Sequence, residues 1–147
     1  METATMGRVI VTAKIENVGD LISVRQGKMT ADQVRRVEVT DALVDTGATN
    51  LSMPKRLIEQ LGLIPFQTRT VRTASGVAEL KVYAGVRLEV QGRECFCQVL
   101  EIADGCPTLI GQVPLEMLDF VVDPHGQRLI GNPEHGGEQM AELYGIL

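Results

Sequence analysis

Residues 42–54 read ALVDTGATNLSMP, a stretch in which an apolar strand pattern leads directly to an acid in a turn. Small residues follow Asp45, and apolar side chains return at alternate positions, Leu51 and Met53. Asp and Gly favour turns, so Asp-Thr-Gly by itself is compatible with the simple end of a strand. Here buried strands are expected on both sides, which places the carboxylate near the interior, where an unpaired charge is costly. Asp45 is therefore a candidate functional residue.

The composition is typical of one soluble globular domain. The chain has 147 residues, 44% hydrophobic and 22% charged, which is enough for a buried core. Its net charge is −5, and it contains no Trp. This balance argues against nucleic acid and against an anionic membrane as partners. The apolar runs are short, so we expect no membrane span and no signal peptide, and we expect a cytoplasmic protein.

Period-two alternation of apolar residues dominates the chain and predicts β-strands. We expect a single all-β domain over residues 1–132, with two short helices, folded as a closed or partly closed barrel. Residues 133–147 are expected to form a C-terminal tail that ends in a short helix. The expected strand segments are 8–15, 21–25, 36–44, 67–74, 77–90, 94–102, 108–111 and a hairpin over 120–131 with its turn at 124–126. The expected helices lie within 54–63, where Gly62 fits the end, and within 112–120.

The stretch around Asp45 resembles the catalytic loop of the retroviral-type, or retropepsin-like, aspartic proteases. A second element of that family, two apolar residues and a glycine before a short helix, is matched by Leu109-Ile110-Gly111. A third, a turn between two long strands at Ala74-Ser75-Gly76, falls where the family has a flap over its substrate. The resemblance covers residues 36 to 130 and implies an acid-protease barrel with one lobe per chain.

The resemblance also implies a homodimer, because aspartic proteases need two aspartates in one site. Asp-Thr-Gly occurs once in this chain, at Asp45, so the second carboxylate must come from Asp45 of another copy. Two carboxylates about 4 Å apart repel each other by roughly 4 kcal/mol at an effective dielectric constant of about 20. One therefore stays protonated while the other is ionised, and the pair can activate a water and polarise a peptide carbonyl.

By matching positions, the resemblance implies a role for each residue of the site. Asp45 is expected to be the acid and base, with Thr46 bonding across the dimer axis and Gly47 allowing close approach of the backbone. An extended polypeptide is the expected substrate, and no cofactor or metal is required. The residues expected to bind it are Ala48, Thr49, Ala74, Ser75 and Gly76.

Two positions depart from the family pattern. Many retroviral members have an acid directly after Asp-Thr-Gly-Ala and an arginine directly after the apolar-apolar-Gly element, joined as an ion pair. Here these positions are Thr49 and Gln112, so both charges are absent together. The substrate contacts made by that acid are therefore not expected here.

Three other readings remain open from the sequence. The chain is alternatively a non-catalytic peptide-binding or dimerisation module of the same fold. A metal or redox site is a second possibility, although two of its cysteines alternate within an apolar strand pattern. Its candidate ligands are Cys95, Cys97, Cys106, His125 and His135. A nucleic-acid-binding barrel is disfavoured by charge and composition. The apolar C-terminal tail is also a candidate contributor to a dimer interface.

Overall fold

The computed structural model describes residues 8–123 and 125–145, and within them it is mostly β. The strands are β1 (Val9–Asn17), β2 (Arg36–Val44), β3 (Leu51–Pro54), β4 (Pro65–Thr73), β5 (Gly76–Val90), β6 (Arg93–Ile102), β7 (Leu109–Ile110), β8 (Phe120–Asp123) and β9 (Arg128–Gly131). The helices are α1 (Val18–Arg25), α2 (Lys55–Leu61) and α3 (Gln112–Leu118), with 3-10 turns η2 (Ala31–Gln33) and η3 (Pro133–His135).

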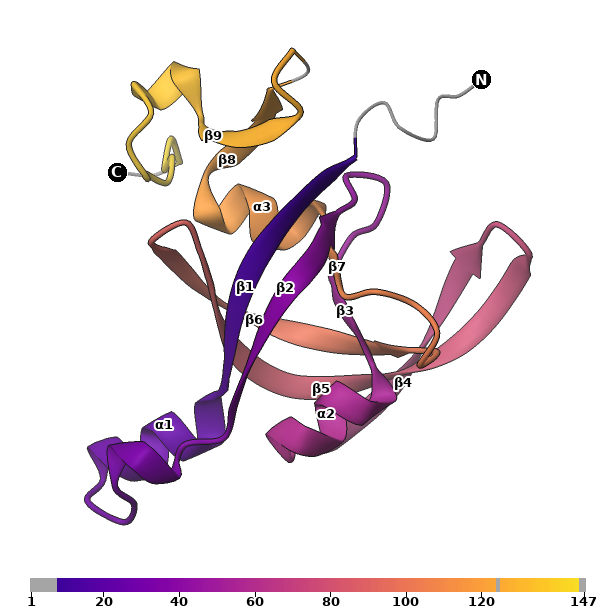
Figure 1. Ribbon diagram of the computed structural model, residues 1–147, viewed down its shortest axis with the longest axis vertical. Coiled ribbons are helices and arrows are strands. Elements are labelled where there is room, and N and C mark those ends of the chain that lie inside the picture. The colour runs from indigo at the N-terminus through magenta and orange to yellow at the C-terminus, as the bar shows by residue number, and fades with distance from the viewer. Residues whose placement is uncertain (1–7, 124, 146–147) are drawn as a thin grey trace.

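One sheet runs in the order β1-β2-β7-β3-β6-β5-β4, and β1 also pairs with β5. This extra pairing closes the sheet into a barrel and leaves β4 outside the ring (Figure 1). The closing pairs run only from Lys14↔Glu89 to Asn17↔Val86, so the barrel is closed unevenly. The all-β barrel expected from the alternation is confirmed.

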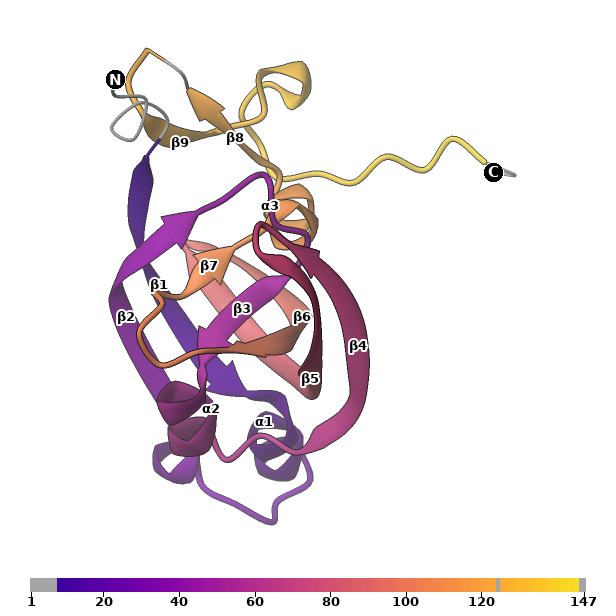
Figure 2. The ribbon, with the colours of Figure 1, turned by 90° about the vertical axis from the view of Figure 1, so that its right-hand side faces the viewer.

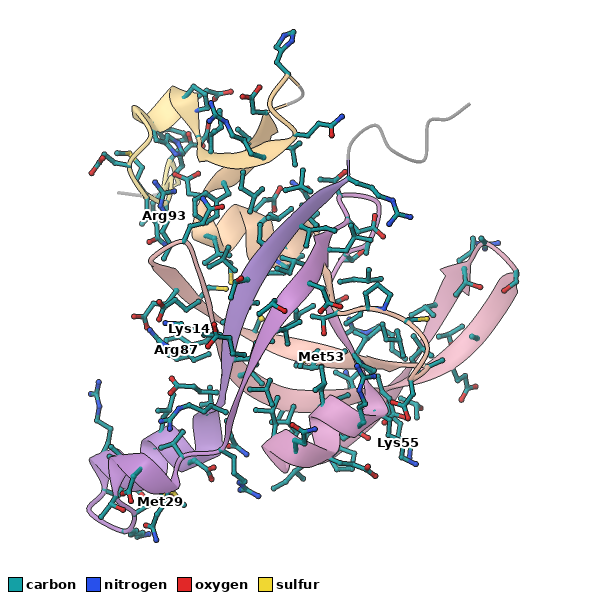
Figure 3. All side chains as sticks on the ribbon, viewed as in Figure 1. Lys14, Met29, Met53, Lys55, Arg87 and Arg93 are labelled. Carbon is teal, nitrogen blue, oxygen red and sulfur yellow. The ribbon has the colours of Figure 1, made fainter. Side chains whose placement is uncertain are left out.

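The barrel interior is filled by the alternate, apolar side chains of its strands. Along β1 the pattern is buried at every second position from Val9 to Asn17. Met53 of β3 lies in the middle of the barrel (Figure 3) and is fully buried. Burying each such side chain contributes about 1.5–3 kcal/mol, so this alternation accounts for much of the driving force for closure. The largest fully buried side chains include Ile15, Leu51, Met53, Ile58, Leu61, Leu88 and Ile110.

The expected strand at 21–25 is wrong, because this segment is helix α1. Asn17 is the N-cap of this helix, and its side chain accepts a hydrogen bond from the backbone N–H of Asp20 at 3.0 Å. Asp20 is buried and accepts bonds from both the backbone and the guanidinium of Arg35. These bonds hold the pKa of Asp20 below its usual value. The helix is thus fixed by polar contacts that the apolar pattern does not reveal.

Helices α2 and α3 lie within the two segments where the sequence predicted helices. Helix α2 ends at Leu61 and is capped by Gly62, whose φ of 62° is the left-handed conformation that favours glycine. Helix α3 follows β7 and packs between the barrel and the β8–β9 hairpin (Figure 1). With α1, the described residues hold three α-helices rather than the expected two.

Strands β4 and β5 form a long hairpin that projects from the barrel (Figure 1). The inner half of β5 belongs to the barrel and the outer half to the hairpin, so one strand of 15 residues joins them. Register shifts interrupt β4 between Pro65 and Gln67 and the β5–β6 pairing between Tyr83 and Val86. Because Pro65 pairs with Tyr83, both irregularities lie at the base of the hairpin.

The C-terminal part of the chain forms a small unit at one end of the barrel, opposite α1 (Figure 1). It consists of the β8–β9 hairpin, η3 and an irregular segment. The short helix expected at the end of the tail is wrong for residues 138–145, which are non-helical (Figure 2). Pro124 of the predicted turn lies outside the described residues, as do residues 1–7 and 146–147 of the predicted domain and tail.

Candidate active site

Asp45 lies directly after β2, on the loop that leads to β3. Its backbone N–H donates to the carbonyl of Ile110 at 3.0 Å and so continues the parallel pairing of β2 with β7. Its carboxylate Oδ1 accepts the N–H of Gly47 at 3.0 Å, and its carbonyl accepts the N–H of Ala48 at 3.0 Å. These bonds form a tight turn that holds the half-buried carboxylate in one orientation.

The small residues after Asp45 leave room for this turn. A Cβ on Gly47 would lie 3.3 Å from Oδ1 of Asp45, closer than an ordinary contact. Thr46, Gly47 and Thr49 are exposed, whereas Ala48 is half-buried. A side chain at position 47 would therefore crowd the carboxylate on the face that is open to solvent.

The loop is held from behind by the segment 109–113. The N–H of Gly111 donates to the carbonyl of Asn50 at 3.0 Å, that of Gln112 to Ala48 at 2.8 Å and that of Val113 to Thr49 at 2.9 Å. A Cβ on Gly111 would lie 2.5 Å from the carbonyl oxygen of Asn50 and 2.7 Å from that of Ala48. Glycine is therefore required at position 111 because a side chain would not fit. The backbone conformation does not require it, since the φ angle of −87° is accessible to other residues.

These backbone bonds join the two segments that an ion pair joins in many retroviral members. The side chain of Gln112 donates to Glu116 at 3.2 Å within α3 and not to Thr49. The loop and the start of α3 are nevertheless joined by the two bonds from residues 112 and 113. The two segments are therefore connected without either charge.

A cleft of about 460 Å³ lies between this loop and the inner side of the β4–β5 hairpin. Three of the predicted site residues, Gly47, Ala48 and Thr49, line it. Asp45 adjoins the cleft, because its carboxylate accepts a hydrogen bond from the N–H of Gly47, which lines it. The other lining residues, which the sequence did not single out, are Asn50, Ser52, Arg69, Thr70, Val71, Arg72, Thr73, Leu80 and Leu100.

The predicted flap residues Ala74, Ser75 and Gly76 form the exposed tip of the hairpin and do not line this cleft. The turn is closed by the hydroxyl of Thr73, which donates to the carbonyl of Gly76 at 2.8 Å. Residues 69–73, which line the cleft, were not predicted as site residues from the sequence. Alternation along β4 indicates which side chains share a face, but not which residues meet the cleft.

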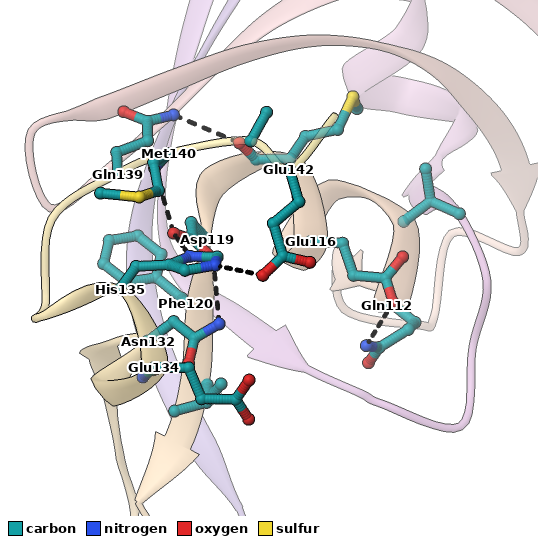
Figure 4. Close-up of a pocket in the computed structure, with 14 residues that line it drawn as sticks. Gln112, Glu116, Asp119, Phe120, Asn132, Glu134, His135, Gln139, Met140 and Glu142 are labelled. Carbon is teal, nitrogen blue, oxygen red and sulfur yellow. Dashed lines mark hydrogen bonds and ion pairs between the residues drawn. The ribbon is translucent and has the colours of Figure 1, made fainter. Parts of the chain in front are cut away.

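A larger cavity, about 890 Å³, lies between α3 and the C-terminal segment (Figure 4). At its centre the buried carboxylate of Asp119 accepts the side-chain N–H of Asn132 at 3.3 Å and the backbone N–H of Met140 at 3.1 Å. His135 places Nδ1 2.6 Å from Asp119 and Nε2 2.8 Å from Glu142. An imidazolium satisfies both carboxylates, since it donates from both ring nitrogens.

The charges of this cluster shift each other's protonation. The pKa of Asp119 lies below its usual value, chiefly because of the bond from His135. The pKa of His135 lies above its usual value, first because of Glu142 and then because of Asp119. Arg93, at the barrel end that faces this segment (Figure 3), donates to the carbonyls of Leu118, Asp119 and Gly137. Charged side chains thus fasten the C-terminal segment to the barrel.

The cysteines and histidines do not gather in the described part of the chain. Cys95 and Cys97 are neighbours on β6, Cys106 is exposed in the loop before β7, and His125 lies at the β8–β9 turn. Within residues 8–123 and 125–145, no three His, Cys, Asp or Glu side chains form a group that could hold a metal ion.

None of the described helices has both the length and the apolar character that crossing a membrane requires. A family model described as "gag-polyprotein putative aspartyl protease" matches residues 33–117. The matched segment runs from η2 to α3 and contains the Asp45 loop, the β4–β5 hairpin and residues 109–111. Strand β1, helix α1 and the C-terminal unit lie outside it. No curated protein matches the chain.

Proposed function

The chain belongs to the gag-polyprotein aspartyl protease family, and we propose that it is an aspartic endopeptidase whose active site forms between two copies. The observation that carries the proposal is the Asp45 loop, a single Asp-Thr-Gly turn held by backbone bonds to Ile110, Gly111 and the start of α3. The chain provides one such carboxylate, so the second comes from Asp45 of an identical partner.

The chemistry follows from the sharing of one proton between two close carboxylates. The ionised Asp45 removes a proton from a water molecule, whose oxygen attacks the carbon of the peptide carbonyl. The protonated Asp45 hydrogen-bonds the carbonyl oxygen and stabilises the negative charge that develops on it. Proton transfer to the amide nitrogen then accompanies cleavage of the C–N bond. Neither a metal nor a covalent intermediate takes part in this scheme.

The neighbouring residues position the loop and the substrate. Thr46 bonds across the two-fold axis, and Gly47 keeps the approach to the carboxylate open. Ala48 and Thr49 contact the peptide from the floor of the cleft. Residues 74–76 lie over it, and the backbone of the hairpin pairs with an extended substrate as an added strand.

The substitution Asp45→Asn tests the catalytic role. We expect cleavage of an unfolded protein at mildly acidic pH to fall by about 1,000-fold or more, because an amide neither ionises nor shuttles a proton. Light scattering should still detect a dimer. Asp41→Asn is the matched control, since Asp41 is an exposed acid on the same strand and should leave activity unchanged. Equal activity of Asp45→Asn and the wild type would refute the role.

Mixing the two proteins tests whether the site is shared. If equal amounts of wild type and Asp45→Asn exchange subunits, random pairing leaves about one quarter of the dimers with two Asp45 residues. Activity per total protein should fall to that fraction, whereas independent subunits would retain one half. Specific peptide binding without any cleavage by the wild type would identify the chain as a non-catalytic module of the same fold.

A further inference from the structure

The two faces of the β4–β5 hairpin carry different side chains. Arg69 pairs with Leu80 and Val71 pairs with Ala78, and all four are half-buried on the inner face. The outer-face pairs are exposed and include Thr68↔Lys81 and Thr70↔Glu79. Antiparallel partners share a face, so Arg69 is the charged side chain of the inner face, and Arg72, exposed on the other face, also lines the cleft.

The charge of Arg69 is not compensated within the described residues. Its one hydrogen bond runs from Nη1 to Oδ1 of Asn50, a neutral acceptor, at 3.5 Å. No carboxylate of residues 8–123 and 125–145 forms an ion pair with it. Several other arginines have acidic partners at close range, as Arg35 has in Asp20 and Arg87 has in Glu94. Partial burial weakens the hydration of the Arg69 guanidinium, so an anion that reaches it can form a favourable ion pair.

The cleft itself is free of acidic side chains. Its lining includes Arg69 and Arg72 but no Asp or Glu, and its nearest polar groups to the loop are the neutral Thr49, Asn50 and Ser52. The bond to Asn50 places Arg69 beside the loop that carries Asp45. A guanidinium held in this way offers a planar pair of donors to a carboxylate that enters the cleft.

We propose that Arg69 is a specificity-determining residue that binds a carboxylate side chain of the substrate, so that the enzyme prefers peptides with Asp or Glu at the subsite beneath the hairpin. This rests on the proposed function, since it assigns a substrate class to the same cleft. Because each subunit of the proposed dimer contributes one Arg69, the preference belongs to two positions of the peptide, one beneath each hairpin.

Binding to the Asp45→Asn variant tests the proposal without relying on catalysis. The probes are ten-residue apolar peptides in which a single Glu, or in a matched set a single Gln, is moved through each position. We expect two positions, one beneath each hairpin, at which the Glu peptide binds about tenfold more tightly than the Gln peptide at pH 6, since a charged hydrogen bond is lost in the second. Adding Arg69→Gln to this variant should abolish the difference.

The control is Lys81→Gln, which removes a positive charge from the outer face of the same hairpin and should retain the preference. Arg69→Glu should reverse it in favour of a Lys peptide. Equal affinity for Glu and Gln peptides at every position overturns the proposal, as does a preference that survives Arg69→Gln. Loss of the dimer in Arg69→Gln also overturns it, because that result assigns the arginine to subunit contact.

The outcomes separate this proposal from the proposed protease. Cleavage by the wild type with no preference for Glu removes the role of Arg69 and leaves the protease standing. Glu-selective binding that depends on Arg69, with no cleavage by the wild type, supports the carboxylate site and refutes the protease.

Discussion

Helix α3 separates two regions that are held in place by different chemistry. On one side, the Asp45 loop is joined to the segment 109–113 by bonds between backbone groups. On the other, the C-terminal segment is fastened by the side chains of Asp119, His135 and Arg93. The loop depends on close backbone approach, and the C-terminal segment depends on charge.

This difference predicts how each region responds to change. Backbone amides do not titrate in the physiological range, so protonation leaves the framework of the loop in place, but an added carbon atom at a point of close approach disrupts it. The cluster around Asp119 is sensitive to protonation and to loss of a single charged group. Variants that act on one region should therefore leave the other unaffected, and three experiments test this separation.

Gly111→Ala should have the largest effect and should act on the loop. The new Cβ would meet the carbonyl oxygens of Asn50 and Ala48 at 2.5 Å and 2.7 Å, so the backbone must shift. We expect the free energy of unfolding, measured in urea, to fall by about 1–3 kcal/mol, the usual cost of overpacking. Cleavage activity should fall as well, because the shift moves the loop that carries Asp45.

Gly105→Ala is the matched control, since nothing lies within 4 Å of a Cβ at that position. It should change the free energy of unfolding little. Wild-type stability and activity in Gly111→Ala would show that the loop does not depend on this approach.

Arg93→Gln should have the next largest effect and should act on the C-terminal segment. It removes the guanidinium that donates to the carbonyls of Leu118, Asp119 and Gly137 and that stacks over the ring of Phe120. We expect amide hydrogen exchange over residues 136–145 to accelerate by about tenfold or more, since bonds to a charged donor are lost. Exchange over the loop 45–50 should stay at the wild-type rate.

Arg25→Gln provides the control, because Arg25 is exposed on α1 at the opposite end of the barrel. Equal acceleration over both regions in Arg93→Gln would show that the loop 45–50 and the C-terminal segment unfold as one unit and are not held independently.

A change of pH should have the smallest effect. The folded pKa of His135 is raised, so its contribution is fully present below the unfolded pKa near 6.5 and is lost as pH rises through the folded value. Raising the pH from 6 to 9 should therefore loosen residues 136–145 by a few fold, measured as exchange corrected for the intrinsic rate. Asp119, whose pKa is lowered, stays ionised over this range.

His135→Gln should remove most of this pH response. Glu142 and Asp119 are the acids that face the imidazole, and both remain in the variant. An unchanged response would assign it to another group and would contradict the role given to His135.

The sequence predicted the barrel where local alternation and tertiary burial agree. The strand expected at 36–44 matches β2 in the structure, and the long strand expected at 77–90 matches β5. The strand expected at 21–25 failed because Asn17 caps a helix and Asp20 binds Arg35, two polar contacts that apolar periodicity does not register. Local pattern therefore predicted what hydrophobic burial decides and missed what polar contacts decide.

The candidate site was likewise predictable from the sequence only in part. The Asp45 loop and the 109–111 element were found from their motifs, whereas the requirement for glycine at 111 depends on how near the two segments lie in space. Arg69 was missed because its cleft-facing position depends on the pairing of β4 with β5. The Asp119–His135–Glu142 cluster joins residues whose contacts follow only from the folded C-terminal unit.

Tyr83 determines how the covering hairpin can move. Both register shifts meet at this residue, and its hydroxyl donates to Glu101 on β6. Burial, and then this bond, raise the pKa of Tyr83 to about 12. Because β5 continues unbroken from barrel to tip, there is no flexible connector about which the hairpin could swing. Any movement of the hairpin relative to the barrel therefore falls at its base near Tyr83, where the bulges interrupt the regular pairing.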